Sequence, residues 1–311
     1  MPINSRHHKI LVSNITKKIK KSLLPEDIIE SYTKNGFAIV KNIVPAQRIN
    51  SLLENIFNLF CRYSTDYQEL KNMEKPWNTE LFHKKLIEFR QKDPESFGAI
   101  YDSLKTSLTL TQLITDNKVA DFVAKFLKIK PSDLSISEPM CRLDVPNDKR
   151  NTLDWHQERS FFPQNRNGLN GLVCWIPLTD ITEEMGPMHI SPRSHAEGQL
   201  KLSNKTKKNT SYTTQIPVPE EFVSKYEDLV VRANAGDAVF FNMLLFHRSG
   251  QNISNKVRLA TQGRFHTSTA DDFIPFDLIN YYNPFIKQKL EKKYDCSDIP
   301  NNERQSPVAT N

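Results

Sequence analysis

The sequence predicts a mainly β fold, a sandwich or jelly roll, that lies behind a layer of helices. Up to about residue 130 the apolar residues recur at the helical period, and after Pro131 they come in short runs of branched and aromatic residues. Prolines and glycines separate these runs at short intervals, which is typical of antiparallel sandwiches and jelly rolls.

The first 130 residues are expected to be mainly helical. Pro25 begins a segment with one apolar face that ends at Gly36, and residues 37–40 then have the composition of a strand. A longer amphipathic helix is expected to start at Pro45. Its apolar residues follow the 3.6-residue period, and residues 81–89 and 119–127 repeat that spacing.

The expected core strands share a high content of branched and aromatic residues: Leu134 to Ile136, Gly171 to Pro177, Leu229 to Arg232, Ala238 to Phe241 and Lys256 to Arg264. Residues 194–219 are polar, and we expect either a mobile lid over a barrel mouth or a plain surface loop. We expect one domain over residues 1–311, with the β core at 131–270 and a flexible tail at 285–311.

Composition indicates a globular protein, because 38% of the residues are hydrophobic and 25% are charged. No apolar stretch approaches the roughly 18 residues of a membrane-spanning helix, so we expect no membrane association and a cytoplasmic location. The four cysteines form no C-x-x-C pair, which argues against a zinc knuckle. The net charge is +6, but the basic run at residues 17–21 has no interleaved aromatics, so we expect no nucleic-acid partner.

Two histidines are followed two positions later by a glutamate, in His156-Gln157-Glu158 and in His195-Ala196-Glu197. Iron(II) in oxygenases is often held by two imidazoles and one carboxylate on one face of the metal. Spacing alone is a weak signal, because about one such match is expected by chance among 8 histidines and 36 acidic residues. The context of each pair therefore has to decide between them.

The segment from Gly236 to Asn252 supplies that context. A tight turn and a buried strand lead to His247, and Arg258 follows eleven residues later. If the strand of Arg258 neighbours that of His247, the guanidinium reaches the far carboxylate of a dicarboxylate bound to the metal. Arginine presents a rigid fork of donors that matches a carboxylate better than lysine does.

These residues resemble the phytanoyl-CoA dioxygenase family, and the resemblance runs from Ser31 to about His266. Four elements come in the order of that family: a helix and strand at Tyr32 to Val40, a Trp-His-Gln-acid box at 155–158, the stretch Gly186 to His195, and the segment from His247 through Arg258. The resemblance implies a double-stranded β-helix (jelly roll, cupin-like) core. It also implies iron(II) as cofactor and 2-oxoglutarate as co-substrate.

The same resemblance implies a role for individual residues. The metal ligands would be His156, Glu158 and His247, Arg258 would anchor 2-oxoglutarate, and Ser249 and Trp175 would be weaker co-substrate contacts. No catalytic residue beyond the metal ligands is expected. The sequence departs from the family pattern at three positions: Glu158 replaces the usual aspartate, Arg193 replaces a usual glycine, and Arg248 stands where a small residue is common.

Other readings of these residues stay open. Glu158 is also a candidate ion-pair partner of Arg159 or Arg142, and Arg258 a candidate core ion-pair residue. Several arginines lie in or near the site segments and favour an anionic substrate, and the candidate substrate contacts among them are Arg142, Arg159, Arg193 and Arg264.

The leading hypothesis is an iron(II)/2-oxoglutarate-dependent dioxygenase that hydroxylates a small anionic metabolite with dioxygen and releases succinate and CO2. The carboxylate at Glu158 argues against a halogenase. Alternatives are a protein-modifying oxygenase, an inactive binding module of the same fold, and a metal-binding β-barrel enzyme that does not use 2-oxoglutarate.

Overall fold

The structure is a computed structural model that describes residues 25–148, 152–162, 164–165, 167–202 and 216–274. Its helices are α2 (Pro25–Asn35), α3 (Ala46–Tyr63), α4 (Glu80–Lys92), α5 (Pro94–Lys105), α6 (Leu108–Ile114), α7 (Asn117–Leu127) and α8 (Glu220–Val223). Its strands are β1 (Phe37–Val40), β2 (Leu134–Asp144), β3 (Gly171–Pro177), β4 (Met188–Ile190), β5 (Leu229–Val230), β6 (Ala238–Asn242), β7 (His247–Ser249) and β8 (Arg258–Thr267).

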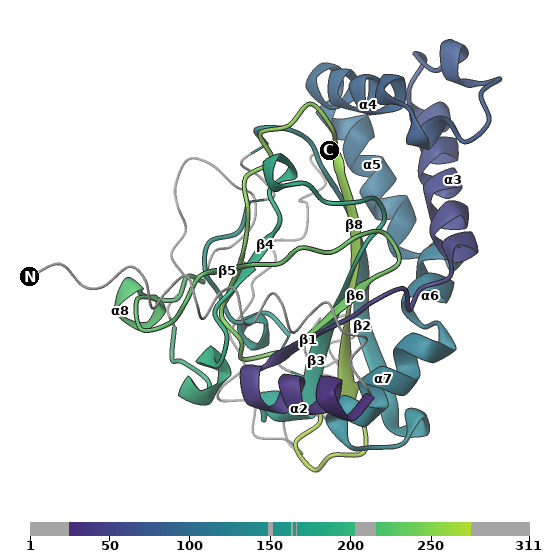
Figure 1. Ribbon diagram of the computed structural model, residues 1–311. Coiled ribbons are helices and arrows are strands. Elements are labelled where there is room, and N and C mark those ends of the chain that lie inside the picture. The colour runs from purple at the N-terminus through teal and green to yellow at the C-terminus, as the bar shows by residue number, and fades with distance from the viewer. Residues whose placement is uncertain (1–24, 149–151, 163, 166, 203–215, 275–311) are drawn as a thin grey trace, which may run out of the picture.

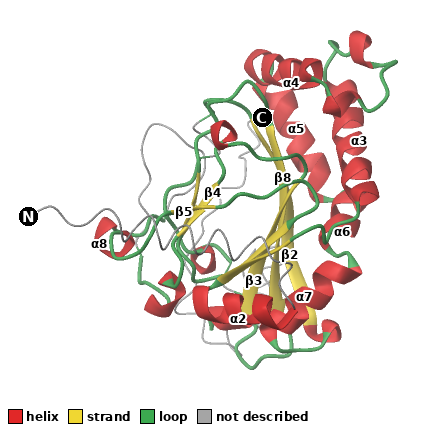
Figure 2. Ribbon diagram, viewed as in Figure 1, coloured by secondary structure: helices red, strands yellow, loops and turns green. Residues whose placement is uncertain are grey.

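Two antiparallel sheets form the core. The larger has five strands in the order β1-β6-β3-β8-β2, and the smaller has three in the order β5-β4-β7. Val173 and Phe241 from the larger sheet pack in one buried cluster with Met188 and Ile190 from the smaller. The two sheets therefore face each other as a sandwich, and helices α2 to α7 lie outside the larger sheet, whereas α8 lies on the side of β5 (Figures 1 and 2). This confirms the predicted jelly-roll core behind a helical layer.

Strand β3 shows how the layers are arranged, because it is buried at every position. Leu172, Cys174 and Ile176 point toward the helical layer, whereas Val173 and Trp175 point into the space between the sheets. A strand covered on both faces reads as a continuous apolar run, and this is why the sequence predicts β3 with the bounds that the structure gives it.

The helical layer forms as the sequence predicts. Helix α3 buries Ile49, Leu52, Leu53, Ile56 and Phe60, which are the residues at the helical period. Helix α2 ends at Gly36, whose φ of 80° and backbone bond to the carbonyl of Tyr32 are those of a glycine helix terminator. The apolar face of the layer and the outer face of the larger sheet belong to one core cluster.

The strands differ from the prediction mainly in length. Strand β2 continues to Asp144 instead of ending at Ile136. Pro139 does not end the strand, because it falls where the pairing with β8 shifts register between Ser137 and Met140. A proline is tolerated at such an irregularity in an edge strand. Strands β4 and β7 have three residues each, too few to show alternation.

Two predictions fall on residues outside this description. Residues 203–215 of the expected lid and residues 285–311 of the expected tail are not among the residues described. Within the part of the chain that is described, no helix is long and apolar enough to cross a membrane.

Candidate metal centre and co-substrate pocket

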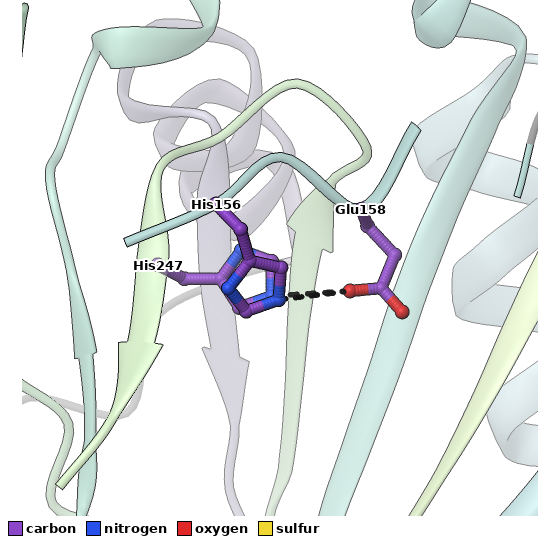
Figure 3. A group of neighbouring side chains, drawn as sticks. All are labelled: His156, Glu158 and His247. Carbon is purple, nitrogen blue, oxygen red and sulfur yellow. Dashed lines mark hydrogen bonds and ion pairs between the residues drawn. The ribbon is translucent and has the colours of Figure 1, made fainter. Parts of the chain in front are cut away.

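His156 and His247 are held together through their backbones. The N–H of His156 donates to the carbonyl of His247 at 3.0 Å, and the N–H of His247 donates back at 3.2 Å. The backbone is extended at Gln157, with φ −107° and ψ 130°, so the side chains of His156 and Glu158 project to the same side. Figure 3 shows the two imidazoles and the carboxylate pointing toward one another.

The backbone also fixes the protonation of both imidazoles. Nδ1 of His156 lies 2.7 Å from the carbonyl of Asp154, and Nδ1 of His247 lies 3.0 Å from that of Leu245. A carbonyl only accepts, so each Nδ1 donates and each Nε2 of a neutral ring carries the lone pair. Burial, together with the neighbouring His156, lowers the pKa of His247 although Glu158 opposes this, so His247 is neutral at pH 7.

The three ligand atoms converge on one point. Oε2 of Glu158 lies 3.2 Å from Nε2 of His247 and 3.5 Å from Nε2 of His156, and all three atoms lie within 4.8 Å of one another. The lone pairs of two imidazole nitrogens and one carboxylate oxygen face each other with no hydrogen-bond donor between them. A cation stabilises such an arrangement. Two imidazoles and one carboxylate on one face suit iron(II) and leave positions open for other ligands. Among the residues described, this is the one group of three such side chains.

Glu158 uses its other oxygen to bind Arg264. Nε of Arg264 donates to Oε1 of Glu158 at 2.7 Å, and the guanidinium lies over the ring of Phe162 at 4.1 Å. Burial alone would raise the pKa of Glu158, but the positive charge of Arg264 opposes it, and the pKa lies well below its usual value. Glu158 is therefore ionised, and its partner Arg264 is one that the sequence did not suggest.

A cavity with an empty volume of about 470 Å³ opens beside the three ligands. Arg258, Ser249 and Trp175 all line it, so the residues expected to hold the co-substrate lie next to those expected to hold the metal.

Arg258 is already engaged on one edge of its guanidinium. Its Nε and Nη2 donate to Oδ2 of Asp144 at 3.1 and 2.7 Å, while Nη1 makes only a long contact of 3.5 Å to the carbonyl of Gly250. Arg142 donates to Oδ1 of the same Asp144 from Nε and Nη2, both at 3.3 Å. Burial would raise the pKa of Asp144, but Arg142 and Arg258 together lower it. Two guanidinium groups thus share one carboxylate, and this cluster has one positive charge in excess.

The condition considered for Arg258, that its strand neighbours the strand of His247, is not met. His247 begins β7 in the smaller sheet, whereas Arg258 begins β8, which pairs with β2 and β3 in the larger sheet. The chain between them crosses from one sheet to the other, so Arg258 faces the metal ligands across the barrel. The core ion pair considered for Arg258 does occur, with Asp144.

The other predicted arginines are divided. Arg142 and Arg264 line the cavity, and so does Arg248, which stacks over Trp155 at 5.2 Å. Arg159 is buried but is not among the lining residues, and Arg193 is exposed on the surface. The structure therefore does not bring these last two to the cavity.

The second His-x-Glu match lies elsewhere. His195 and Glu197 belong to a short 3-10 helix, Ser194–Glu197, and Glu197 accepts hydrogen bonds from Tyr226 at 2.9 Å and from Lys225 at 3.3 Å. Neither residue belongs to the metal-binding group found among the described residues.

Sequence reasoning missed several lining residues, of which Asp144 and Gln262 carry polar side chains. A signal for Gln262 was present, because positions 258, 262 and 264 alternate along β8 and therefore share one face. Asp144 was harder to find, because it reaches Arg258 through the register between β2 and β8.

A jelly roll that presents two imidazoles and one carboxylate beside an arginine-lined cavity defines the class of non-haem iron(II)- and 2-oxoglutarate-dependent dioxygenases. The family model described as phytanoyl-CoA dioxygenase (PhyH) matches residues 32–260. The chain belongs to the phytanoyl-CoA dioxygenase family.

Two relatives are similar in sequence, and two solved structures are similar in fold. The chain is 25% identical to the peroxisomal phytanoyl-CoA dioxygenase of Homo sapiens, over 75% of this chain and 66% of that protein, and 21% identical to the ectoine dioxygenase of Bordetella bronchiseptica, over 74% and 71%. It therefore spans just under two thirds of the human protein. EvdO2 from Micromonospora carbonacea var. aurantiaca, complexed with 2-oxoglutarate, is 18% identical with a TM-score of 0.54, over 81% of this chain and 96% of that one. The epimerase SnoN, in complex with Fe3+, α-ketoglutarate and nogalamycin RO, is 18% identical with a TM-score of 0.53, over 81% and 86%. At these identities the structures show the fold alone.

Proposed function

We propose that the protein is an iron(II)/2-oxoglutarate-dependent dioxygenase that hydroxylates a small anionic metabolite and releases succinate and CO2. The observation that carries this proposal is the convergence of His156, Glu158 and His247 beside a cavity that Arg258 lines. The donor set is the one that iron(II) oxygenases use.

In this proposal the residues of the chain bind the metal and the co-substrate and keep water out of the cavity. His156, Glu158 and His247 would hold the metal, and Arg258 would bind the far carboxylate of 2-oxoglutarate, with Ser249 and Trp175 beside it. When bound, iron and 2-oxoglutarate would supply the means of activating dioxygen, which is the oxidant: 2-oxoglutarate gives two electrons as it loses CO2, one oxygen atom enters succinate and the other is inserted into the substrate C–H bond. The protein contributes no further catalytic group in this proposal. It positions the substrate, and the buried walls of the cavity exclude water.

Charge supports an anionic substrate. Arg142, Arg248, Arg258 and Arg264 line the cavity, whereas its lining carboxylates are Asp144 and Glu158. Arg248 is also paired with Asp228 at 2.9 Å. The charges of iron(II) and of 2-oxoglutarate cancel, so positive charge remains in excess and favours an anion such as a carboxylate or phosphonate.

We also propose that residues 1–311 form one domain and that the protein works in the cytoplasm. The first proposal is supported by the single core cluster that the helical layer shares with the larger sheet. The second is supported by the free thiols of Cys61, Cys141 and Cys174, which suit a reducing compartment. The human relative, by contrast, is named as peroxisomal.

One observation favours a metal enzyme that does not use 2-oxoglutarate, namely the ion pair of Arg258 with Asp144. Arg258→Ala separates the two functions. If Arg258 holds the far carboxylate, the variant leaves that charge without its partner, and 2-oxoglutarate affinity should fall by about 2 to 5 kcal/mol, or roughly 30-fold to several thousand-fold. Arg258→Lys should restore only part of the loss, because a point charge cannot form two parallel hydrogen bonds.

The measurement is an anaerobic titration of 2-oxoglutarate into the iron-loaded wild type and variants, followed through the metal-to-ligand absorption band. Iron affinity without co-substrate serves as the control and should hardly change. Equal 2-oxoglutarate affinities in wild type and Arg258→Ala would reject Arg258 as the anchor and favour the alternative. Succinate release with anionic metabolite pools, compared with protein extracts, then separates a metabolite hydroxylase from a protein-modifying oxygenase.

A further inference from the structure

The two carboxylate oxygens of Glu158 have different partners. Oε2 faces the Nε2 atoms of His247 and His156, at 3.2 and 3.5 Å, whereas Oε1 accepts from Nε of Arg264 at 2.7 Å. The side chains of Glu158 and Arg264 are only 5% and 4% exposed, so water does not compete effectively for either oxygen. The contact is a charge-assisted hydrogen bond in a buried setting, where such bonds are strong.

Arg264 is itself rigidly placed. It lies in β8, the fourth strand of the larger sheet, and is paired with Val173 of β3 on one side and Ser137 of β2 on the other. Phe162 covers its guanidinium at 4.1 Å. A residue fixed on both sides by strands and stacked on a ring presents its donor at a defined point.

The carboxylate of Glu158 needs a hydrogen-bond donor in a fixed position. A glutamate side chain has three rotatable bonds, and Glu158 lies in a short 3-10 helix rather than in a strand. With neither oxygen held, the carboxylate is free to rotate and to offer both oxygens to a metal. With Oε1 held by Arg264, only Oε2 faces the imidazoles.

We propose that Arg264 is a positioning residue for the metal: it holds Oε1 of Glu158 and so makes the glutamate a one-oxygen ligand. This assigns Arg264 to the metal centre rather than to the substrate, and it leaves the remaining positions of the metal free for co-substrate and dioxygen. The inference rests on the ligand set of the proposed function.

Arg264→Gln tests the assignment through the sign of its effect on metal affinity. If Arg264 acts by positioning, its loss should weaken binding about 10- to 100-fold, as for other groups that orient a metal ligand. If it acted only as a positive charge near the metal, its loss would strengthen binding, because the repulsion would be gone. Unchanged or tighter binding would overturn the proposal.

The readout is binding of Co(II) to the metal-free full chain, measured by competition with a chelator, and the visible bands of the bound Co(II), which report its coordination. The bands should change in Arg264→Gln, since the carboxylate is no longer restricted to one oxygen. Arg264→Lys keeps a buried cation beside Glu158 and should fold if the glutamine variant does not. It should bind Co(II) more weakly than wild type, because the ammonium lacks the Nε–H at the position of the contact, and wild-type affinity would count against the proposal.

A second background tests whether Arg264 acts through Glu158. Aspartate is one methylene shorter and cannot contact Arg264 and the imidazoles together. In the Glu158→Asp chain, Arg264→Gln should therefore change Co(II) affinity by less than about threefold, so that the two changes are strongly coupled. An equal loss in both backgrounds would mean that Arg264 acts on the fold in general, which contradicts the proposal.

Arg90→Gln is the matched control. Arg90 also pairs with a carboxylate, Asp148 at 3.2 Å, and also lies over an aromatic ring, Phe97 at 5.7 Å, but it lies in the helical layer. Its loss should leave Co(II) affinity unchanged, and a matching loss in Arg90→Gln would contradict the specific role of Arg264. Equal Co(II) binding by wild type and His156→Ala would reject the metal centre itself, and with it the proposed function, whatever Arg264→Gln did.

Discussion

Each proposed metal ligand in this protein has a second partner that fixes its orientation. Nδ1 of His156 and Nδ1 of His247 donate to backbone carbonyls, and Oε1 of Glu158 accepts from Arg264. The atoms left over, two Nε2 and one Oε2, are those that face one another. Partners of this kind fix the orientation of the side chains that would bind the metal.

Glu197→Ala tests the choice between the two His-x-Glu matches. The partners of Glu197 are Tyr226 and Lys225, and its ion pair is solvent-screened, so its loss should change stability little and leave iron affinity unchanged. Glu158→Ala, measured beside it by equilibrium dialysis, should lose most of its iron affinity. Loss of iron from Glu197→Ala alone would transfer the ligand role to the second match.

The proposed metal ligands could be predicted from the sequence, but the residues that contact them could not. His156 and Glu158 occur in one short motif, and His247 follows a tight turn and a buried strand, so all three could be recognised along the chain. Arg264, by contrast, meets Glu158 across 106 positions, and Asp144 meets Arg258 across 114. Such pairs depend on strand register, which a single sequence does not reveal.

At the scale of elements, the smaller sheet depends on a close approach of two glycines. Gly186 precedes β4 and Gly250 follows β7, and the N–H of Gly250 donates to the carbonyl of Pro187 at 2.9 Å. Because β7 carries His247 and Ser249, this contact helps to place one metal ligand and one expected co-substrate contact.

Gly250→Ala should disturb that sheet. A Cβ at Gly250 would lie 2.4 Å from the carbonyl oxygen of Pro187 and 2.7 Å from the carbonyl carbon of Gly186, and these backbone atoms cannot move aside as a side chain would. We expect a loss of about 1 to 3 kcal/mol in urea unfolding, with weaker metal binding.

Gly98→Ala is the control for this variant. Gly98 lies in α5, and a Cβ there would meet nothing within 4 Å, so alanine should stabilise the helix by about 0.5 to 1 kcal/mol. If Gly250→Ala were as stable as wild type and bound metal normally, the two glycines would not be required for the close approach.

The length of an element decided how well the sequence predicted it. Helix α3 and strand β3 are long or fully buried, and their apolar patterns gave nearly their true bounds. Strands β4 and β7 are short and lie between turns, so they carry no pattern of their own. They form because the larger sheet offers them an apolar face to cover.

At the scale of the whole molecule, a buried histidine of the helical layer is hydrogen-bonded to the residue that precedes β8. His83 of α4 accepts the N–H of Val257 at its Nδ1, at 3.1 Å, and Val257 directly precedes Arg258. This hydrogen bond from the helical layer thus helps to place the start of β8, where Arg258 lies.

This histidine should make the protein less stable in acid. Burial, assisted by Lys256, lowers the pKa of His83 from 6.5 to about 4. The folded protein therefore favours the neutral ring, so the stabilisation is complete above about pH 6.5 and is lost as the pH falls toward 4. The size of the effect is about 3 kcal/mol, at 1.36 kcal/mol per pKa unit.

His83→Gln keeps an acceptor for Val257 but does not titrate. Urea unfolding of wild type and variant at pH 7 and pH 4.5 should show a smaller loss of stability in the variant. His266, whose pKa burial lowers to about 3, remains in both proteins and contributes equally. Parallel losses in the two proteins would show that His83 does not cause the acid sensitivity.

The backbone bond between His156 and His247 has a consequence for the choice of metal. These backbone hydrogen bonds bring the two histidines together, so a metal ion would not be needed to do so. The proposed ligands would then be in place for any divalent ion that enters. Nitrogen and oxygen ligands bind copper and zinc more tightly than iron(II) across the first transition row. We therefore expect that a preformed site of this kind would not select iron by affinity, and that the supply of free metal ions would decide which one it holds.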